Sequence, residues 1–228
     1  MQTEAKSTLN IIASAPSHCP LCHHSQLIFF HQDKKRSFYQ CNNCQLVSVP
    51  QSLFLTPDEE KAVYDLHDNT NADEGYRRFL SRTLSPVLNR VSKEAKGLDY
   101  GCGEGAVLSQ IAAEQGINVA NYDLYYHNNN EVLAAQYDFI TMTEVIEHIS
   151  DAKQIFQQLD GLLKTGGILA IMTKRVKSQQ AFENWHYKHD PTHINFYSIA
   201  TFEWLAKTYQ WQLEIIDNDV VFFHKAKG

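Results

Sequence analysis

The sequence predicts an α/β fold in which a small cysteine-rich module precedes a mostly parallel sheet. Strand-prone and helix-prone segments alternate from about residue 96 to the C-terminus, which is typical of a parallel sheet with helices on its faces. A glycine-rich turn follows the first of these strands, at residues 101–105. Two C-x-x-C pairs lie between residues 19 and 44, ahead of the sheet.

Composition narrows the class of protein. The chain has 228 residues, of which 43% are hydrophobic and 20% charged, enough for one α/β domain and a small accessory module. No apolar run approaches a membrane span, and the N-terminus lacks the pattern of a secretory signal. A net charge of -6 disfavours broad electrostatic attachment to nucleic acid or to an anionic membrane. An odd number of cysteines, five, without an export signal favours the cytoplasm.

The chain divides into four parts along its length. We expect a flexible tail at 1–16, a cysteine-rich β module at 17–50, a helical linker or lid at 51–95 and the α/β domain at 96–228. The first linker helix opens at Thr56-Pro57, where Glu59 can complete a capping box. The second is expected over 73–91, interrupted by Pro86.

Within the α/β domain, each element is predicted from its own residues. Strands are expected at 97–100, 119–123, 137–142 and 168–173, and helices at 106–114, from 143 or 144 to 163, and at 198–209. The strands 213–216 and 220–224, joined by Asp217-Asn218-Asp219, form a terminal antiparallel hairpin. Only 13 residues separate Asp123 from Tyr137, so one crossover must be shortened.

The glycine turn predicts a ligand site. Glycines at the end of a strand let the chain turn sharply and let a ligand approach the backbone. The spacing G-x-G-x-G at Gly101, Gly103 and Gly105 differs from the G-x-G-x-x-G of dinucleotide binders. Asp123, at the end of the next strand, can accept hydrogen bonds from the two hydroxyls of a ribose.

These residues carry a resemblance to a known family. LDYGCGEG at 98–105, NYD at 121–123 and YDFITMTEVIEHISDAKQIFQQLDGLLKTGGILAIMT at 137–173 resemble class I S-adenosylmethionine-dependent methyltransferases. The resemblance covers about 60% of the chain, from about residue 96, and implies a Rossmann-like sheet that binds S-adenosyl-L-methionine. It implies that the following residues bind or flank the cofactor: Asp99, Gly101, Cys102, Gly103, Tyr122, Asp123, Leu124, Tyr125, Thr143 and Glu144.

The cysteine pairs predict a structural zinc site. Cys19-x-x-Cys22 and Cys41-x-x-Cys44 are separated by 18 residues, which matches a tetrahedral site built from two knuckles. The segment resembles the zinc ribbons that precede some bacterial methyltransferases, including certain ribosomal RNA methyltransferases. The residues beside the ligands, His23 and His24, are interpreted as solvent-facing or as neighbours of the ligands rather than as ligands.

A basic run lies between the knuckles. Lys34-Lys35-Arg36 is expected at the tip of the ribbon hairpin, as a solvated turn. The alternative is a contact with RNA or with a protein partner.

A second group of residues predicts chemistry next to the glycine turn. On the expected helix, Glu144, Glu147 and His148 at i, i+3 and i+4 would share one face and could bind a divalent cation such as Mg²⁺ or Mn²⁺. The pattern E-x-x-E-H resembles ubiquinone-pathway O-methyltransferases and small-RNA 3′-terminal 2′-O-methyltransferases, which use a divalent metal. His193 corresponds to a further histidine of the second family. The alternative is a site without metal, in which the carboxylate contacts the cofactor and His148 packs or caps.

The acceptor pocket is expected in the histidine-rich segment 185–193. A neutral imidazole can act as a general base near pH 7, so His148, His189 and His193 are the catalytic candidates. Four residues of the linking helices are candidates for a lid over the site, namely Tyr64, His67, Tyr76 and Arg77.

Three functions are consistent with these sequence features. The first is methylation of an oxygen of a small hydroxylated metabolite. The second is methylation of RNA that the ribbon binds, and the acidic net charge disfavours this function. The third is a non-catalytic scaffold, which the intact turn and Asp123 disfavour. The methyl acceptor and the oligomeric state are left open, and no membrane partner is expected.

Overall fold

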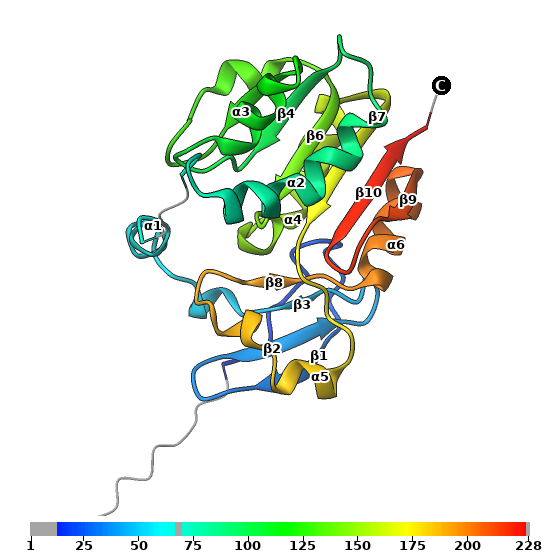
Figure 1. Ribbon diagram of the computed structural model, residues 1–228. Coiled ribbons are helices and arrows are strands. Elements are labelled where there is room, and N and C mark those ends of the chain that lie inside the picture. Colours follow the sequence, from blue (N-terminus) through cyan, green and yellow to red (C-terminus); the bar gives the residue numbers. More distant parts are fainter. Residues whose placement is uncertain (1–12, 67–69, 227–228) are drawn as a thin grey trace, which may run out of the picture.

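Two sheets organise the molecule, whose computed structural model describes residues 13–66 and 70–226 (Figure 1). The larger sheet has six strands in the order β5-β4-β6-β7-β10-β9. Its strands are β4 (Lys96–Tyr100), β5 (Asn118–Tyr122), β6 (Tyr137–Thr143), β7 (Leu163–Met172), β9 (Trp211–Ile215) and β10 (Val220–Lys225). Strands β5, β4, β6 and β7 run parallel, and β10 is antiparallel to both of its neighbours. The predicted fold class, a mostly parallel sheet with a terminal antiparallel hairpin, is therefore confirmed.

The helices largely follow the sequence signals. They are α1 (Pro57–Tyr64), α2 (Glu74–Leu88), α3 (Val107–Glu114), α4 (Ala152–Leu162), α5 (Gln179–Glu183) and α6 (Ile199–Tyr209). The expected capping box forms at Thr56 and Glu59. The predicted interruption of α2 by Pro86 is wrong, because the helix runs through Pro86 and ends at Leu88.

Alternation along the strands separates two cores. Phe139 and Ala170 point to the face covered by α2 and α3. Their neighbours Ile140 and Leu169 point to the opposite face, which α4 and α6 cover. The sheet is thus buried on both sides, as expected of a parallel sheet in an α/β protein.

The connection between β5 and β6 is shortened, as predicted. It contains only a 3₁₀ turn, Asn130–Ala134, between the two strands. By contrast, the helix predicted from residue 143 or 144 begins only at Ala152, with Asp151 as its cap. Glu144 adopts a left-handed backbone (φ 54°), and Ile146–His148 is a 3₁₀ turn. Glu144 and Glu147 therefore do not share a helix face.

The ribbon sheet takes its fourth strand from the far end of the chain. Its order is β1 (Leu27–Gln32), β2 (Ser37–Cys41), β3 (Val47–Ser48) and β8 (Asn195–Phe196). In Figure 1, β8 lies beside β3 below the larger sheet. The knuckle residues Cys19, Cys41 and Cys44 belong to the same buried cluster as α4 and α6, so the ribbon and the larger sheet share a core.

Two further expectations concern the N-terminal tail and membrane-spanning helices. Residues 1–12 of the expected tail lie outside the described residues. No helix within residues 13–66 and 70–226 is both long enough and apolar enough to cross a membrane.

Candidate active site and zinc site

One cavity of about 1090 Å³ runs along the carboxyl ends of β4, β5 and β6. Its first part, the glycine-turn end, is lined by Gly101, Cys102, Gly103, Tyr122, Asp123, Leu124 and Tyr125. Its second part, the histidine end, is formed by Glu144, His148, Lys174, Tyr187, Asp190 and His193 together with the buried Glu147 behind them. Thr143 also lines the cavity, and its hydroxyl is buried without a hydrogen-bond partner among the described residues.

The glycine turn has the backbone geometry that its sequence predicts. Gly101 and Gly103 have φ of +80° and +65°, in the region that favours glycine. The amide of Gly101 donates to the Tyr122 carbonyl (N···O 2.7 Å), which ties the turn to β5. The turn therefore leaves a groove at the cavity wall with little side-chain bulk.

Asp123 closes the groove on its far side. Its Oδ2 accepts from the Gly103 amide at 3.0 Å, and its Oδ1 accepts from the amides of Tyr125 and Tyr126 at 2.9 and 3.1 Å. Each carboxylate oxygen has about two acceptor positions, so Oδ2 keeps one for a ligand hydroxyl. Next to it, Leu124 is 59% exposed, which suits a hydrophobic cover for a planar group.

Asp99 lies beneath the turn rather than on the cavity wall. Only 4% of the residue is exposed, and its Oδ1 accepts a hydrogen bond from the Thr141 hydroxyl of β6 at 2.8 Å. Burial raises the pKa of the Asp99 carboxyl to about 7. The group thus links β4 to β6 under the turn.

Helix α1 contacts the glycine-turn end. Glu60 accepts hydrogen bonds from the hydroxyls of Tyr64 (2.9 Å) and Tyr125 (2.6 Å), and both tyrosines line the cavity. Of the other lid candidates, Tyr76 also lines the cavity. Arg77 does not line it and pairs with Glu114. His67 lies outside the described residues.

Two carboxyl groups with unusual environments lie at the histidine end. Glu147 is fully buried, its Oε1 accepts from the Tyr187 hydroxyl, and its Oε2 has no hydrogen-bond partner among the described residues. Glu144 lines the cavity, and its Oε1 is likewise without a partner in that part of the chain. Burial raises the pKa of Glu144 to about 7 and, together with the charge of Glu144, that of Glu147 to about 8.

Two imidazoles lie close to Glu147. The rings of His148 and His193 are 4.7 Å apart, and each Nδ1 lies near a backbone carbonyl, that of Thr192 (3.2 Å) or of Tyr187 (2.7 Å). A carbonyl can only accept, so Nδ1 of each neutral ring carries the proton. Burial lowers the pKa of His193, which keeps that ring neutral near pH 7.

Three of the four predicted cation ligands come together. One ligand atom from each of Glu147, His148 and His193 lies within 4.8 Å of the others, whereas Glu144 is outside this group. Histidines whose Nδ1 is held by a carbonyl are typical of metal ligands. The donor set of one carboxylate and two imidazoles therefore fits a divalent cation, and fits Mn²⁺ better than Mg²⁺.

The structure does not bring His189 to the cavity. His189 is exposed and lies in the 3₁₀ turn His186–His189, where its Nε2 is 3.3 Å from the Lys188 ammonium. His189 is absent both from the residues that line the cavity and from the group of Glu147, His148 and His193. His189 was a candidate because it belongs to the histidine-rich segment 185–193, where the acceptor pocket was expected.

A comparison with models of protein families shows to which family the chain belongs. The model of the methyltransferase domain matches residues 73–215, more than half of the chain and all of the cavity's glycine-turn end. The chain belongs to the methyltransferase domain family. This confirms the class that the glycine turn and Asp123 predict.

Relatives of this methyltransferase carry related names. It is 28% identical to the "Ubiquinone biosynthesis O-methyltransferase" of Actinobacillus pleuropneumoniae, over 40% of this chain and 53% of that protein. It is 25% identical to the protein of the same name from Aliivibrio fischeri, over 57% of this chain and 69% of that protein. The chain thus spans about half the length of several curated relatives that it matches.

A solved structure supports the fold of the methyltransferase. The N1-methyltransferase of 1,6-didemethyltoxoflavin from Burkholderia thailandensis, with bound 1,6-didemethyltoxoflavin and S-adenosylhomocysteine, superposes with a TM-score of 0.51 at 13% identity. The match covers 88% of this chain and 100% of that chain.

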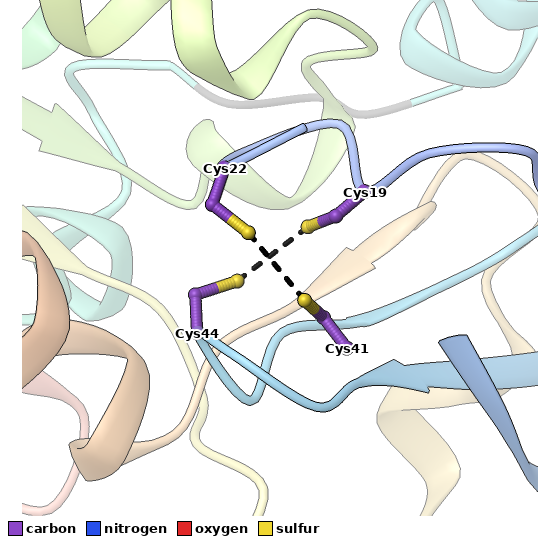
Figure 2. A group of neighbouring side chains, drawn as sticks. All are labelled: Cys19, Cys22, Cys41 and Cys44. Carbon is purple, nitrogen blue, oxygen red and sulfur yellow. Dashed lines mark hydrogen bonds between the residues drawn. The ribbon is translucent and has the colours of Figure 1, made fainter. Parts of the chain in front are cut away.

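The four knuckle cysteines of the methyltransferase converge on one point. Figure 2 shows their sulfur atoms facing a common centre, with Sγ–Sγ distances of 3.5 Å between Cys19 and Cys44 and 3.4 Å between Cys22 and Cys41. Tetrahedral zinc with Zn–S bonds of about 2.3 Å places sulfurs about 3.8 Å apart, so a small outward shift would admit the ion. The predicted cluster of four thiols is therefore present, and its donor chemistry fits zinc.

The histidines beside the second cysteine lie outside this cluster. His23 is exposed, and the Nδ1 of His24 accepts from the Gln26 amide at 3.2 Å. Their interpretation as non-ligands agrees with the group of potential ligands, which contains only the four cysteines.

The expectation that Arg36 lies in a solvated turn is wrong. Lys34 and Lys35 are exposed at the hairpin, as expected, but Arg36 is only 8% exposed. Its guanidinium donates to backbone carbonyls of residues 188–193. No local sequence signal distinguishes it from its two lysine neighbours, because its partners lie more than 150 residues away.

Proposed function

We propose that this methyltransferase transfers the methyl group of S-adenosylmethionine to an oxygen of a small hydroxylated metabolite. The observation that carries the proposal is that one cavity joins the glycine turn and Asp123 to the cluster of Glu147, His148 and His193. A donor bound at the first place would have its reactive end directed towards the second.

The glycine-turn end fits the methyl donor. Gly101 and Gly103 would flank its methionyl part, and the remaining acceptor position on Asp123 Oδ2 would receive a ribose hydroxyl. Leu124 and Tyr125 would cover the adenine. When bound, the donor supplies a methyl group on a positively charged sulfur.

The histidine end fits the activation of a hydroxyl group. Glu147, His148 and His193 would hold a divalent cation, which lowers the pKa of a coordinated hydroxyl. Without the cation, His193 can accept the hydroxyl proton on Nε2, because its Nδ1 is committed to the Tyr187 carbonyl. In both cases, residues on the cavity wall would hold the acceptor oxygen opposite the donor.

The relatives favour the same chemistry. The curated relatives named above are called O-methyltransferases, and we infer a hydroxylated small molecule from that name. RNA is the weaker alternative, because Arg36 of the basic run is buried and the net charge is -6. The cytoplasm is the compartment that this function favours.

Two measurements test the proposal. Calorimetry with S-adenosylhomocysteine should show binding that falls at least tenfold in Asp123→Asn and stays unchanged in the surface control Asp160→Asn. A panel of catechols, simple phenols and short RNAs should then be incubated with S-adenosylmethionine while S-adenosylhomocysteine is measured. Absence of binding would refute the cofactor assignment, and turnover with RNA but not with any hydroxylated small molecule would refute the acceptor assignment.

A further inference from the structure

We infer that the zinc ribbon forms the rear wall of the histidine end, and that Arg36 is a positioning residue for the segment that carries His193. The inference rests on the proposed function only in regarding the histidine end as the side where the acceptor binds. The ribbon then supports the active site, instead of serving as a separate module that binds a partner.

Arg36 gathers one stretch of backbone around its guanidinium. One terminal nitrogen donates to the carbonyls of His193 (2.9 Å) and Pro191 (3.3 Å). The other donates to those of Asp190 (2.8 Å) and Lys188. A guanidinium presents its donors in a rigid planar fork, so one side chain fixes four carbonyls within six residues.

The fixed segment carries His193 and directly follows Tyr187. The Tyr187 carbonyl receives the Nδ1 proton of His193 at 2.7 Å, and the Tyr187 hydroxyl donates to Glu147. Therefore the backbone path held by Arg36 sets both the orientation of the His193 ring and the tyrosine that contacts Glu147. A displacement of this path would separate the members of the cluster.

A second route joins the ribbon to the same cluster. The amide of Val49, just after β3, donates to the Ile194 carbonyl at 2.9 Å, and the amide of Ile194 donates to the Glu147 carbonyl at 2.9 Å. Two consecutive hydrogen bonds thus connect the ribbon backbone to Glu147. The pairing of β3 with β8 continues this contact through Val47 and Phe196.

Side-chain packing also joins the ribbon to the elements behind the histidine end. Aromatic residues from both sides meet in one cluster, in which Phe38 lies 5.1 Å from Phe182 and 5.7 Å from Phe196 between ring centroids. At the knuckle, the Pro20 carbonyl accepts from the Lys153 amide at the start of α4 (3.0 Å). The ribbon is therefore fastened behind the histidine end at several points.

The glycine-turn end is supported differently. Gly101 is tied to β5, and Asp123 is tied to the amides of its own loop. Within the described part of the chain, no hydrogen bond joins residues 13–50 to residues 96–127. A change at Arg36 should consequently disturb the histidine end and leave binding of the donor intact.

The first test needs no acceptor. Arg36→Met keeps much of the length of the side chain and removes its donors, Arg36→Lys keeps only the charge, and Lys35→Met is the matched control on the exposed neighbour. In Arg36→Met we expect backbone amide exchange over residues 190–195 to rise at least tenfold, with exchange over 98–107, zinc content and S-adenosylhomocysteine affinity within twofold of the native protein. Lys35→Met should match the native protein throughout.

The second test uses the acceptor that turns over in the panel described above. With it, kcat/KM for the acceptor should fall at least tenfold in Arg36→Met while KM for S-adenosylmethionine stays unchanged, and Arg36→Lys should recover part of the loss. Native exchange over 190–195 in Arg36→Met would overturn the inference, as would an equal rise over 98–107, which would indicate general unfolding. If the native protein methylates nothing in the panel, the proposed function fails, yet the exchange and affinity measurements still decide the role of Arg36.

Discussion

A Cβ atom placed on Gly101 would lie 2.5 Å from Cγ2 of Val145. Val145 follows Glu144 in the loop after β6, so the turn at one end of the cavity packs against the loop that leads to the other end. The approach is possible only because residue 101 has no side chain. The glycine turn and the loop that follows β6 are therefore in direct contact.

Two glycine substitutions test this contact. Gly101→Ala meets Val145 and also carries the cost of a positive φ, so we expect a loss of roughly 2–4 kcal/mol in the free energy of unfolding. Gly103→Ala has the same backbone cost, but no heavy atom lies within 4 Å of its Cβ, and it should lose only about 1 kcal/mol. Urea unfolding measures both, and equal losses would contradict the contact.

Asp99 should make stability depend on pH. Because burial raises its folded-state pKa to about 7, above the unfolded value of about 4, the protonated form is favoured in the folded protein. Its contribution to stability is present below pH 4 and is lost as pH rises through 7. Asp99→Asn should therefore gain stability relative to the native protein between pH 4 and pH 8, by up to about 4 kcal/mol. A constant difference in unfolding free energy across that range would contradict the raised pKa.

Binding of Mn²⁺ should strengthen with pH. Glu147 must lose its proton to act as a ligand, and its pKa is raised to about 8, so affinity should rise about tenfold per pH unit below pH 8 and then level off. Electron paramagnetic resonance of added Mn²⁺ measures this. Glu147→Gln should abolish the binding, whereas the exposed control Glu131→Gln should retain it. Binding that is the same from pH 6 to pH 9 would exclude Glu147 as a ligand.

Zinc should contribute to the stability of the whole chain. We expect about one zinc ion per chain, and its loss in Cys41→Ser should cost roughly 5 kcal/mol or more, because three of the four cysteines lie in the core shared with α4 and α6. Cys102→Ser removes a buried thiol outside the cluster and should keep the zinc. Elemental analysis with thermal unfolding decides, and a Cys41→Ser protein that keeps native zinc content would rule the site out.

The two histidines that the sequence could not separate should behave differently. His193→Ala removes a ring that lines the cavity, and methyl transfer should fall by about a hundredfold or more. His189→Ala changes an exposed ring away from the cavity and should leave the rate within twofold. Single-turnover assays with the acceptor identified above provide the comparison. Similar losses in both variants would mean that the segment moves as a unit.

The parts of the fold that could be predicted are those whose signals are local. The turn at Gly101, the carboxylate of Asp123 and the spacing of Cys19 and Cys41 each depend on a few neighbouring residues, and each lies where it was expected. The shortened crossover followed from a count of residues, because 13 residues have no room for a helix and a strand.

The region around Glu144 shows why periodicity can mislead. Glu144, Glu147 and His148 have helical spacing, but the backbone of Glu144 has a positive φ and His148 ends a 3₁₀ turn. The turn still brings Glu147 and His148 together, with His193 as the third member. Spacing alone could not exclude Glu144, since its position depends on the loop that packs against Gly101.

Long-range contacts were the other feature that could not be predicted from the sequence. Arg36 reads as part of a solvated basic run, and Asn195-Phe196 is too short to read as a strand. Both are explained by partners distant in sequence, the carbonyls of residues 188–193 for Arg36 and β3 for β8. Those carbonyls, together with the ring of Phe38 at 5.4 Å, offset the cost of burying the guanidinium.

The pairing of β3 with β8 also has a consequence for how the chain is made. Val47 leaves the ribosome about 150 residues before Phe196, the strand neighbour that completes its sheet. The knuckles can capture zinc early, but the sheet around them stays open until most of the chain has been synthesised. During that interval, the unpaired edge of β3 is the surface that a chaperone would have reason to protect.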